Sequence, residues 1–113
     1  MHELSITQSM LGIVLEQTEK AGARKVNRIN LVIGEMCGYV EECVQFYFDF
    51  LAKGTPAEKA VLSFKMVPPE ARCRECGTTF QPGEFNWSCT GCGSVNIEIT
   101  AGKELFVESI EVD

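Results

Sequence analysis

The sequence predicts an α+β fold, in which a three-stranded sheet with two helices carries an inserted zinc-ribbon module. Two observations support this prediction. Hydrophobic periodicity gives the order helix, strand, helix, strand, followed by a cysteine-rich stretch and a closing strand. The composition also changes between residues 70 and 99, where four cysteines stand among few aliphatic residues. Because strand-like segments flank this stretch, we expect the module to be inserted between two strands of one sheet.

Residues 4–20 have the spacing of an amphipathic helix. Ser5 and Gln8 resemble a capping box and predict a first turn close to Ser5, while Gly22 is a natural stop. The apolar stripe of this helix is expected to comprise Leu4, Leu11, Val14 and Leu15, widened by Ile6, Met10 and Ile13.

Residues 25–33 alternate in the manner of a strand and are followed by a loop at 34–38. Residues 40–53 return to helical spacing, with Glu41 and Glu42 in the first turn, where the helix dipole favours negative charge. Cys43 is expected to be a buried core residue. The apolar face of this second helix is expected to comprise Val40, Cys43, Val44, Tyr47 and Leu51, broadened by Phe46, Phe48 and Phe50.

Two further strands are predicted at residues 60–67 and 103–112. The closing strand is too short to be stable alone, and we expect it to pair with the first two strands. The sequence therefore indicates an α/β domain over residues 1–68, completed by the C-terminal strand at 100–113, and a ribbon over residues 69–99.

The charge and cysteine content narrow the classes of function. The formal net charge is -6, so the chain repels phosphates and nucleic acid is a poor default partner. The apolar run at residues 10–15 is too short to span a bilayer, and no signal peptide is visible, so we expect no membrane partner and a cytoplasmic location. Six cysteines in a reducing compartment suggest metal or redox chemistry rather than a disulfide framework.

The cysteines of the module form two pairs with the spacing of a tetrahedral zinc site. Cys73 and Cys76 are separated by two residues, and so are Cys89 and Cys92. A module of this size has too small a hydrophobic core to fold without a cross-link or a bound metal ion. Bound Zn(II) would supply the missing folding energy. A redox-active pair, disulfides and an iron–sulfur cluster are the alternatives. With four thiolates the site would be closed, so catalysis at the zinc is not expected.

The single histidine of the chain, His2, lies next to the N-terminus. The backbone amine of Met1, the amide nitrogen of His2 and its imidazole can chelate one ion, and planar nitrogen coordination suits Ni(II) or Cu(II). Glu3 could add an oxygen ligand or orient the imidazole. The alternative is an inert, solvated histidine. Cys37, in the loop at 34–38, is either a plain thiol or a soft ligand near this site.

Together these motifs resemble the HypA/HybF family of nickel metallochaperones in [NiFe]-hydrogenase maturation, over the whole chain. The matching segments are "MHELSIT" at 1–7, "IGE" at 33–35, "KGT" at 53–55, "CRECG" at 73–77 and "CTGCG" at 89–93. The resemblance implies a nickel-binding α/β domain with His2 as nickel ligand and Glu3 at or beside the site. It also implies zinc bound by the four paired cysteines. Some family members carry an aspartate near the start of the second helix, where this chain has Val40, followed by Glu41 and Glu42.

The function expected from this resemblance is that of a non-enzymatic carrier of Ni(II). The implied partners are a HypB-type nickel-binding GTPase and the [NiFe]-hydrogenase large-subunit precursor; related proteins also serve urease. The alternative is a zinc-ribbon adaptor that binds protein or nucleic acid and has no nickel role. An enzyme is not expected, because the sequence shows no base–nucleophile arrangement and no Gly-rich phosphate loop.

Overall fold

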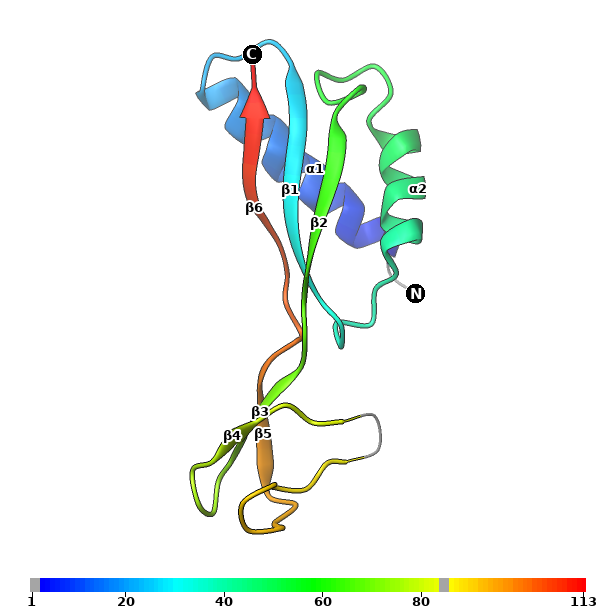
Figure 1. Cartoon of the computed structure of the whole chain (residues 1–113). Helices are drawn as coiled ribbons and strands as arrows, with labels where there is room; N and C mark the ends of the chain where they lie inside the picture. Colours follow the sequence, from blue (N-terminus) through cyan, green and yellow to red (C-terminus); the bar gives the residue numbers. More distant parts are fainter. Residues whose placement is uncertain (1–2, 84–85) are drawn as a thin grey trace. The chain divides into compact units, whose positions relative to one another are not determined.

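The computed structural model describes residues 3–83 and 86–113 (Figure 1). The elements are α1 (Glu3–Lys20), β1 (Val26–Gly34), α2 (Glu41–Leu51), β2 (Val61–Val67), β3 (Glu70–Cys73), β4 (Thr79–Phe80), β5 (Ile97–Ala101) and β6 (Leu105–Val112). The chain divides into two compact units. The first unit comprises residues 1–32, 38–65 and 105–113, and the second comprises 33–37 and 66–104.

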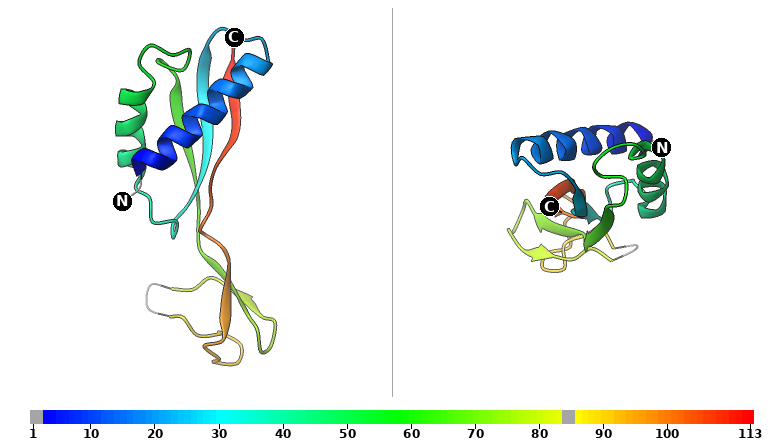
Figure 2. Two further views of the ribbon diagram at one scale, coloured as in Figure 1. Left: turned by 180° about the vertical axis from the view of Figure 1, so that it is seen from behind. Right: turned by 90° about the horizontal axis from the view of Figure 1, so that it is seen from above.

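The first unit is built on a three-stranded sheet, as the sequence predicts, and the order of its strands is β2-β1-β6. β1 and β2 run in the same direction and are joined through α2, whereas β6 runs antiparallel to β1 (Figure 1). The view from above in Figure 2 shows both helices on one side of this sheet. α1 packs against α2 and against β6, so the helices cover one face, as expected for the α+β class.

The buried face of α1 differs from the predicted stripe. The helix begins at Glu3, two residues before the predicted first turn, and Leu4 and Ile13 are exposed. Thr7 and Thr18 are buried instead. The Thr7 hydroxyl donates to the Glu3 carbonyl, and the Thr18 hydroxyl donates to the Val14 carbonyl. Threonine can therefore lie on the core face here, because each hydroxyl is satisfied within its own helix.

α2 is buried along a narrower face than its composition suggests. Val44 and Phe48 are buried, whereas Phe46 and Phe50 are 68% and 66% exposed. The prediction that Cys43 is a buried core residue is wrong, since its side chain is exposed. The sheet has only three strands, so it covers one line of side chains along this short helix and leaves the next line in solvent.

The second unit contains an antiparallel sheet with the order β4-β3-β5. Ala71 of β3 pairs with Phe80 of β4 on one side and with Ile99 of β5 on the other. Its buried residues are Ala71, Cys73, Phe80 and Cys89, with Ile97 and Ile99 packed against them. Half of this small core consists of cysteines that the sequence assigns to the metal site.

No helix in the described part of the chain is long and apolar enough to cross a membrane.

In the second unit, the backbone at residues 34–36, at Pro69 and at residues 102–104 approaches too closely to leave room for side chains at Gly34 and Gly102. The amide of Gly34 donates to the carbonyl of Glu104 at 2.7 Å, and the amide of Met36 donates to that of Gly102 at 2.6 Å. A Cβ on Gly34 would overlap the Gly102 carbonyl, and a Cβ on Gly102 would lie 2.7 Å from Cα of Pro69. Gly102 also has φ +109°, a region that favours glycine.

We therefore predict that Gly34→Ala destabilises the protein by about 1–3 kcal/mol, because the added methyl group forces these backbones apart. Chemical denaturation would measure the loss. Gly12→Ala is the matched control, since a Cβ at Gly12 in α1 meets no atom within 4 Å. This control is expected to gain about 0.5–1 kcal/mol. Equal stability of Gly34→Ala and the parent chain would contradict the close approach.

Candidate metal centres

The structure brings the four predicted cysteines of the second unit together. The sulfurs of Cys73, Cys76, Cys89 and Cys92 all lie within 4.8 Å of one another. The Sγ atoms of Cys73 and Cys92 are 3.6 Å apart, and those of Cys76 and Cys89 are 3.5 Å apart. A tetrahedron with Zn–S bonds of 2.3 Å has edges of about 3.8 Å. The observed spacing is therefore close to that of a zinc-thiolate centre.

The first cysteine turn directs backbone amides at one sulfur. The N–H groups of Glu75 and Cys76 donate to Sγ of Cys73 at 3.4 and 3.5 Å. Gly77 closes the turn by donating its N–H to the Cys73 carbonyl at 3.0 Å, with φ +78°. Only glycine adopts this backbone conformation without strain. The glycine after the pair therefore lets the chain curl so that amides face the metal-binding sulfur.

The second turn repeats this geometry. The N–H groups of Gly91 and Cys92 donate to Sγ of Cys89 at 3.2 and 3.4 Å. Gly93, with φ +78°, donates to the Cys89 carbonyl at 2.9 Å. In both turns the first cysteine is buried and accepts two amide hydrogen bonds, while the second is exposed. Two equivalent turns thus hold the four sulfurs as a closed set.

Neighbouring groups shift the pKa values of the cysteine thiols in this cluster. The hydroxyl of Thr78, 3.1 Å from Sγ of Cys76, and the Thr78 amide lower the pKa of Cys76 to about 6. The Ser94 amide acts to lower the pKa of Cys92, but the neighbouring cysteines raise it to about 12. Four adjacent thiols cannot all lose their protons unless a cation takes the protons' place. The donor set therefore fits a bound divalent metal.

Thr78 is a residue of this centre that the sequence analysis did not identify. Its hydroxyl contacts Cys76, and its carbonyl accepts the Cys73 N–H at 2.9 Å. A Cβ on Gly91 would lie 2.8 Å from the Thr78 hydroxyl oxygen, so the second turn packs closely against this side chain. The only signal in the sequence is its place directly after Gly77, which does not distinguish it from any other polar residue.

Part of the second candidate site, at the N-terminus, lies outside the described residues. This applies to Met1 and His2. Glu3 is described: it stands at the start of α1 and is 7% exposed. The backbone N–H of Val40 donates to its carboxylate. Val40 is the N-cap residue of α2, so the structure places Glu3 beside the start of the second helix. Glu41 and Glu42 follow in the first turn of α2.

The remaining cysteines do not join the four-cysteine cluster. Cys37 is half-buried in the turn after β1, and Cys43 is exposed on α2. Within residues 3–83 and 86–113, the four paired cysteines are the one group of three or more metal-ligating side chains with converging donor atoms.

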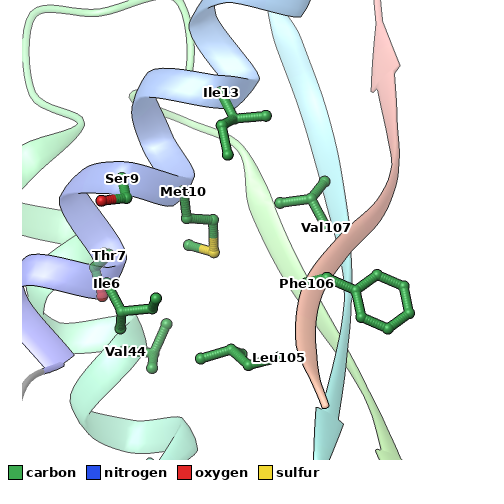
Figure 3. Close-up of a pocket in the computed structure, with 9 residues that line it drawn as sticks. All are labelled: Ile6, Thr7, Ser9, Met10, Ile13, Val44, Leu105, Phe106 and Val107. Carbon is green, nitrogen blue, oxygen red and sulfur yellow. The ribbon is translucent and has the colours of Figure 1, made fainter.

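The first unit also contains an apolar cavity of about 250 Å³ between α1 and β6 (Figure 3). Ile6 and Met10 of α1 point towards Leu105 and Val107 of β6, while Phe106 points away. No ionisable side chain lines this cavity. Its lining is therefore mainly apolar, apart from the hydroxyl groups of Thr7 and Ser9 and the thioether of Met10.

Comparisons with known proteins agree with these features. A family model described as "Hydrogenase/urease nickel incorporation, metallochaperone, hypA" matches residues 1–112. The hydrogenase maturation factor HypA of Dehalococcoides mccartyi (strain 195) is 51% identical over 113 residues, covering 100% of this chain and 95% of that protein. The factor of the same name from Caldanaerobacter subterraneus is 43% identical, with 100% of both chains covered.

The fold is likewise similar to that of a solved relative. The solution structure of the Ni metallochaperone HypA from Helicobacter pylori aligns with a TM-score of 0.73 at 27% identity. The alignment covers 99% of this chain and 97% of the other.

We predict that Cys76→Ser lowers zinc affinity by more than about a hundredfold. Removing a group that hydrogen-bonds to a metal ligand already lowers affinity by about 10–100-fold, and removing the ligand itself should lower it further. Elemental analysis and competition with a chromophoric chelator would measure the content and the affinity. Cys43→Ser is the matched control, since it also removes an exposed thiol but lies outside the cluster. The prediction is wrong if Cys76→Ser binds one zinc as tightly as Cys43→Ser.

Proposed function

This chain belongs to the HypA family of nickel metallochaperones in hydrogenase maturation, and from this premise we propose that it binds Ni(II) at its N-terminus and delivers it to the [NiFe]-hydrogenase large-subunit precursor. The observation that carries the proposal is the family match over residues 1–112, which includes the Met-His-Glu start. The four-cysteine cluster, a second feature expected of the family, adds support.

The proposed nickel ligands are nitrogens at the chain terminus. The α-amine of Met1, the amide nitrogen of His2 and the His2 imidazole form fused chelate rings, which suit Ni(II). Glu3 supplies a carboxylate at the edge of this set. Because the Val40 amide already binds that carboxylate, Glu3 has a fixed position beside the start of α2. A ligand set that also includes water would exchange readily, as delivery of the ion requires.

The four cysteines are proposed to hold Zn(II) as a resident structural ion. Four thiolates saturate a tetrahedral centre and leave no position for a substrate or an exchangeable water. Zinc would also add folding energy to a unit whose buried core is small. In this proposal the two metals differ in role, because zinc stays while nickel is cargo.

The proposed partners follow from the family. They are a HypB-type nickel-binding GTPase, which would supply or receive the ion, and the hydrogenase precursor. The family description also includes urease, which makes a urease apoprotein a second candidate client. We propose that the chain acts as a carrier in the cytoplasm. In this proposal it catalyses no reaction and has neither nucleic acid nor a membrane as a partner. An adaptor without a nickel role is the competing hypothesis, and nickel binding at His2 separates the two.

We predict that His2→Ala lowers nickel affinity by about a hundredfold or more and leaves one zinc bound, because His2 carries the only imidazole of the chain. Isothermal titration with untagged protein would measure the nickel affinity, and elemental analysis the zinc. A Gly-Ser extension before Met1 tests the amine separately and is expected to weaken nickel binding. If His2→Ala binds nickel as well as the parent chain, the carrier hypothesis fails at this site.

A second prediction concerns Val40, which caps α2 without a side-chain hydrogen bond. Val40→Asp is expected to stabilise the protein by about 1 kcal/mol through N-capping. It should also raise nickel affinity on the order of tenfold, by adding a carboxylate beside Glu3. Val40→Asn is the matched control, because it caps the helix without the charge. If both variants change nickel affinity equally, the carboxylate is not a ligand.

A further inference from the structure

A groove of about 480 Å³ runs between α2 and β2 in the first unit. Its apolar floor comes from Leu62 and Phe64 of β2. Its wall on the α2 side consists of Glu41, Glu42, Gln45, Phe46 and Asp49. Every charged side chain that lines the groove is therefore acidic, and apolar surface lies beneath the carboxylates.

Two aromatic side chains extend the apolar surface of this groove along α2. Phe46 and Phe50, one helical turn apart, are 68% and 66% exposed. The ring of Phe46 contacts the ring of Tyr47 edge-to-face, with centroids 5.4 Å apart. Adjacent exposed aromatic rings rimmed by polar groups are typical of interaction sites.

The carboxylates beside these rings are not neutralised within the described part of the chain. None of the ion pairs there involves Glu41, Glu42 or Asp49. Glu41 and Glu42 complement the helix dipole, but Asp49 lies in the last turn, where no basic residue stands and negative charge is unfavourable. Gln45 donates to Asp49 at 2.8 Å and orients it. This i,i+4 hydrogen bond supports the helix, but it does not neutralise the charge of Asp49.

The strand that supplies the floor of the groove, β2, is an edge strand among the described residues. In the order β2-β1-β6, the single strand neighbour of β2 is β1. The Val67 carbonyl accepts the Glu35 amide and so points towards the β1 side. By the alternation of a strand, the backbone groups of Leu62 and Phe64 point the other way, along the open edge. Such an edge is a template for another strand.

We propose that this groove is the docking site for an extended, basic segment of a partner protein, which adds to β2 as a further strand. Backbone pairing along β2 would provide affinity, and alternate apolar side chains would pack on Leu62, Phe64 and Phe46. Lysine or arginine side chains between them would meet the carboxylates of α2. Lys65 of β2 does not oppose this, because alternation places its side chain on the other face of the strand.

The test uses the full-length, zinc-loaded chain and a synthetic seven-residue peptide that alternates lysine with leucine, matching the seven residues of β2. Two-dimensional ¹⁵N NMR would follow the titration. We expect shifts confined to α2 and β2, slower hydrogen exchange at the amides of Leu62 and Phe64, and weaker binding at higher salt. A peptide with glutamate in place of lysine should not bind.

Variants assign the binding to this groove. The double variant Glu42→Lys, Asp49→Lys should weaken peptide binding at least tenfold. The control Glu19→Lys, Glu108→Lys makes the same change in net charge at exposed positions on α1 and β6 and should not affect binding. Phe46→Ala should also weaken binding, while Phe106→Ala, which removes an exposed ring outside the groove lining, should not.

Three results would overturn the proposal. Equal weakening by both charge variants would mean attraction to overall charge alone. Shifts on α2 without exchange protection at Leu62 and Phe64 would mean that the peptide docks on the helix rather than adding to the sheet. Absence of specific shifts at millimolar peptide would exclude the site. None of these results depends on nickel, so this test and that of the proposed carrier role fail independently.

Discussion

The geometry of the second unit depends on four sulfur atoms sharing one small volume. Their separations of 3.5 and 3.6 Å are too short for four thiolates without a cation, and the raised pKa of Cys92 reflects that conflict. Cys73 and Cys89 also form half of the buried core of this unit. A metal ion bound there would therefore couple ion binding to core formation, because two of its ligands are core residues.

The two candidate metal centres differ in how readily a bound ion could exchange, which is what separates a structural site from a carrier site. The cysteine cluster is closed, with two sulfurs buried and each of these sulfurs holding two amide hydrogen bonds. Removing a bound ion would leave four closely spaced sulfurs, two of them on core residues, without the cation that stabilises their approach. In the proposed terminal site, Glu3 is the described residue, and the Val40 amide already holds its carboxylate, so no ion is needed to fix that side chain. A chain that delivers one ion and keeps another needs both kinds of site.

The sequence predicted the parts of this structure that local rules determine. Cysteine spacing, with glycine after each pair, was sufficient to predict the cluster. Two residues between the cysteines of a pair form a tight turn that directs both sulfurs at one ion. The two helices and the three strands of the first unit followed from periodicity, whereas β3, β4 and β5 were not predicted, because such short strands carry little hydrophobic pattern. The buried faces did not follow from periodicity: Thr7 and Thr18 reach the α1 core because their hydroxyls bond within the helix, which a polarity pattern does not register. Cys43 is exposed because α2 meets a sheet of only three strands.

α2 departs from the rules of helix stability at three points. Its N-cap is Val40, with no side-chain hydrogen bond, its last turn has an acid and no base, and two of its aromatic rings are exposed. By these rules a missing N-cap costs about 1 kcal/mol and an acid in the last turn a few tenths, part of which the Gln45–Asp49 hydrogen bond offsets. Natural sequences tolerate such local conflicts mainly at functional sites. The departures at the N-cap lie beside Glu3, whereas the acid and the rings lie along the groove. One short helix thus borders the candidate nickel site at its N-terminus and the candidate docking groove along its exposed side.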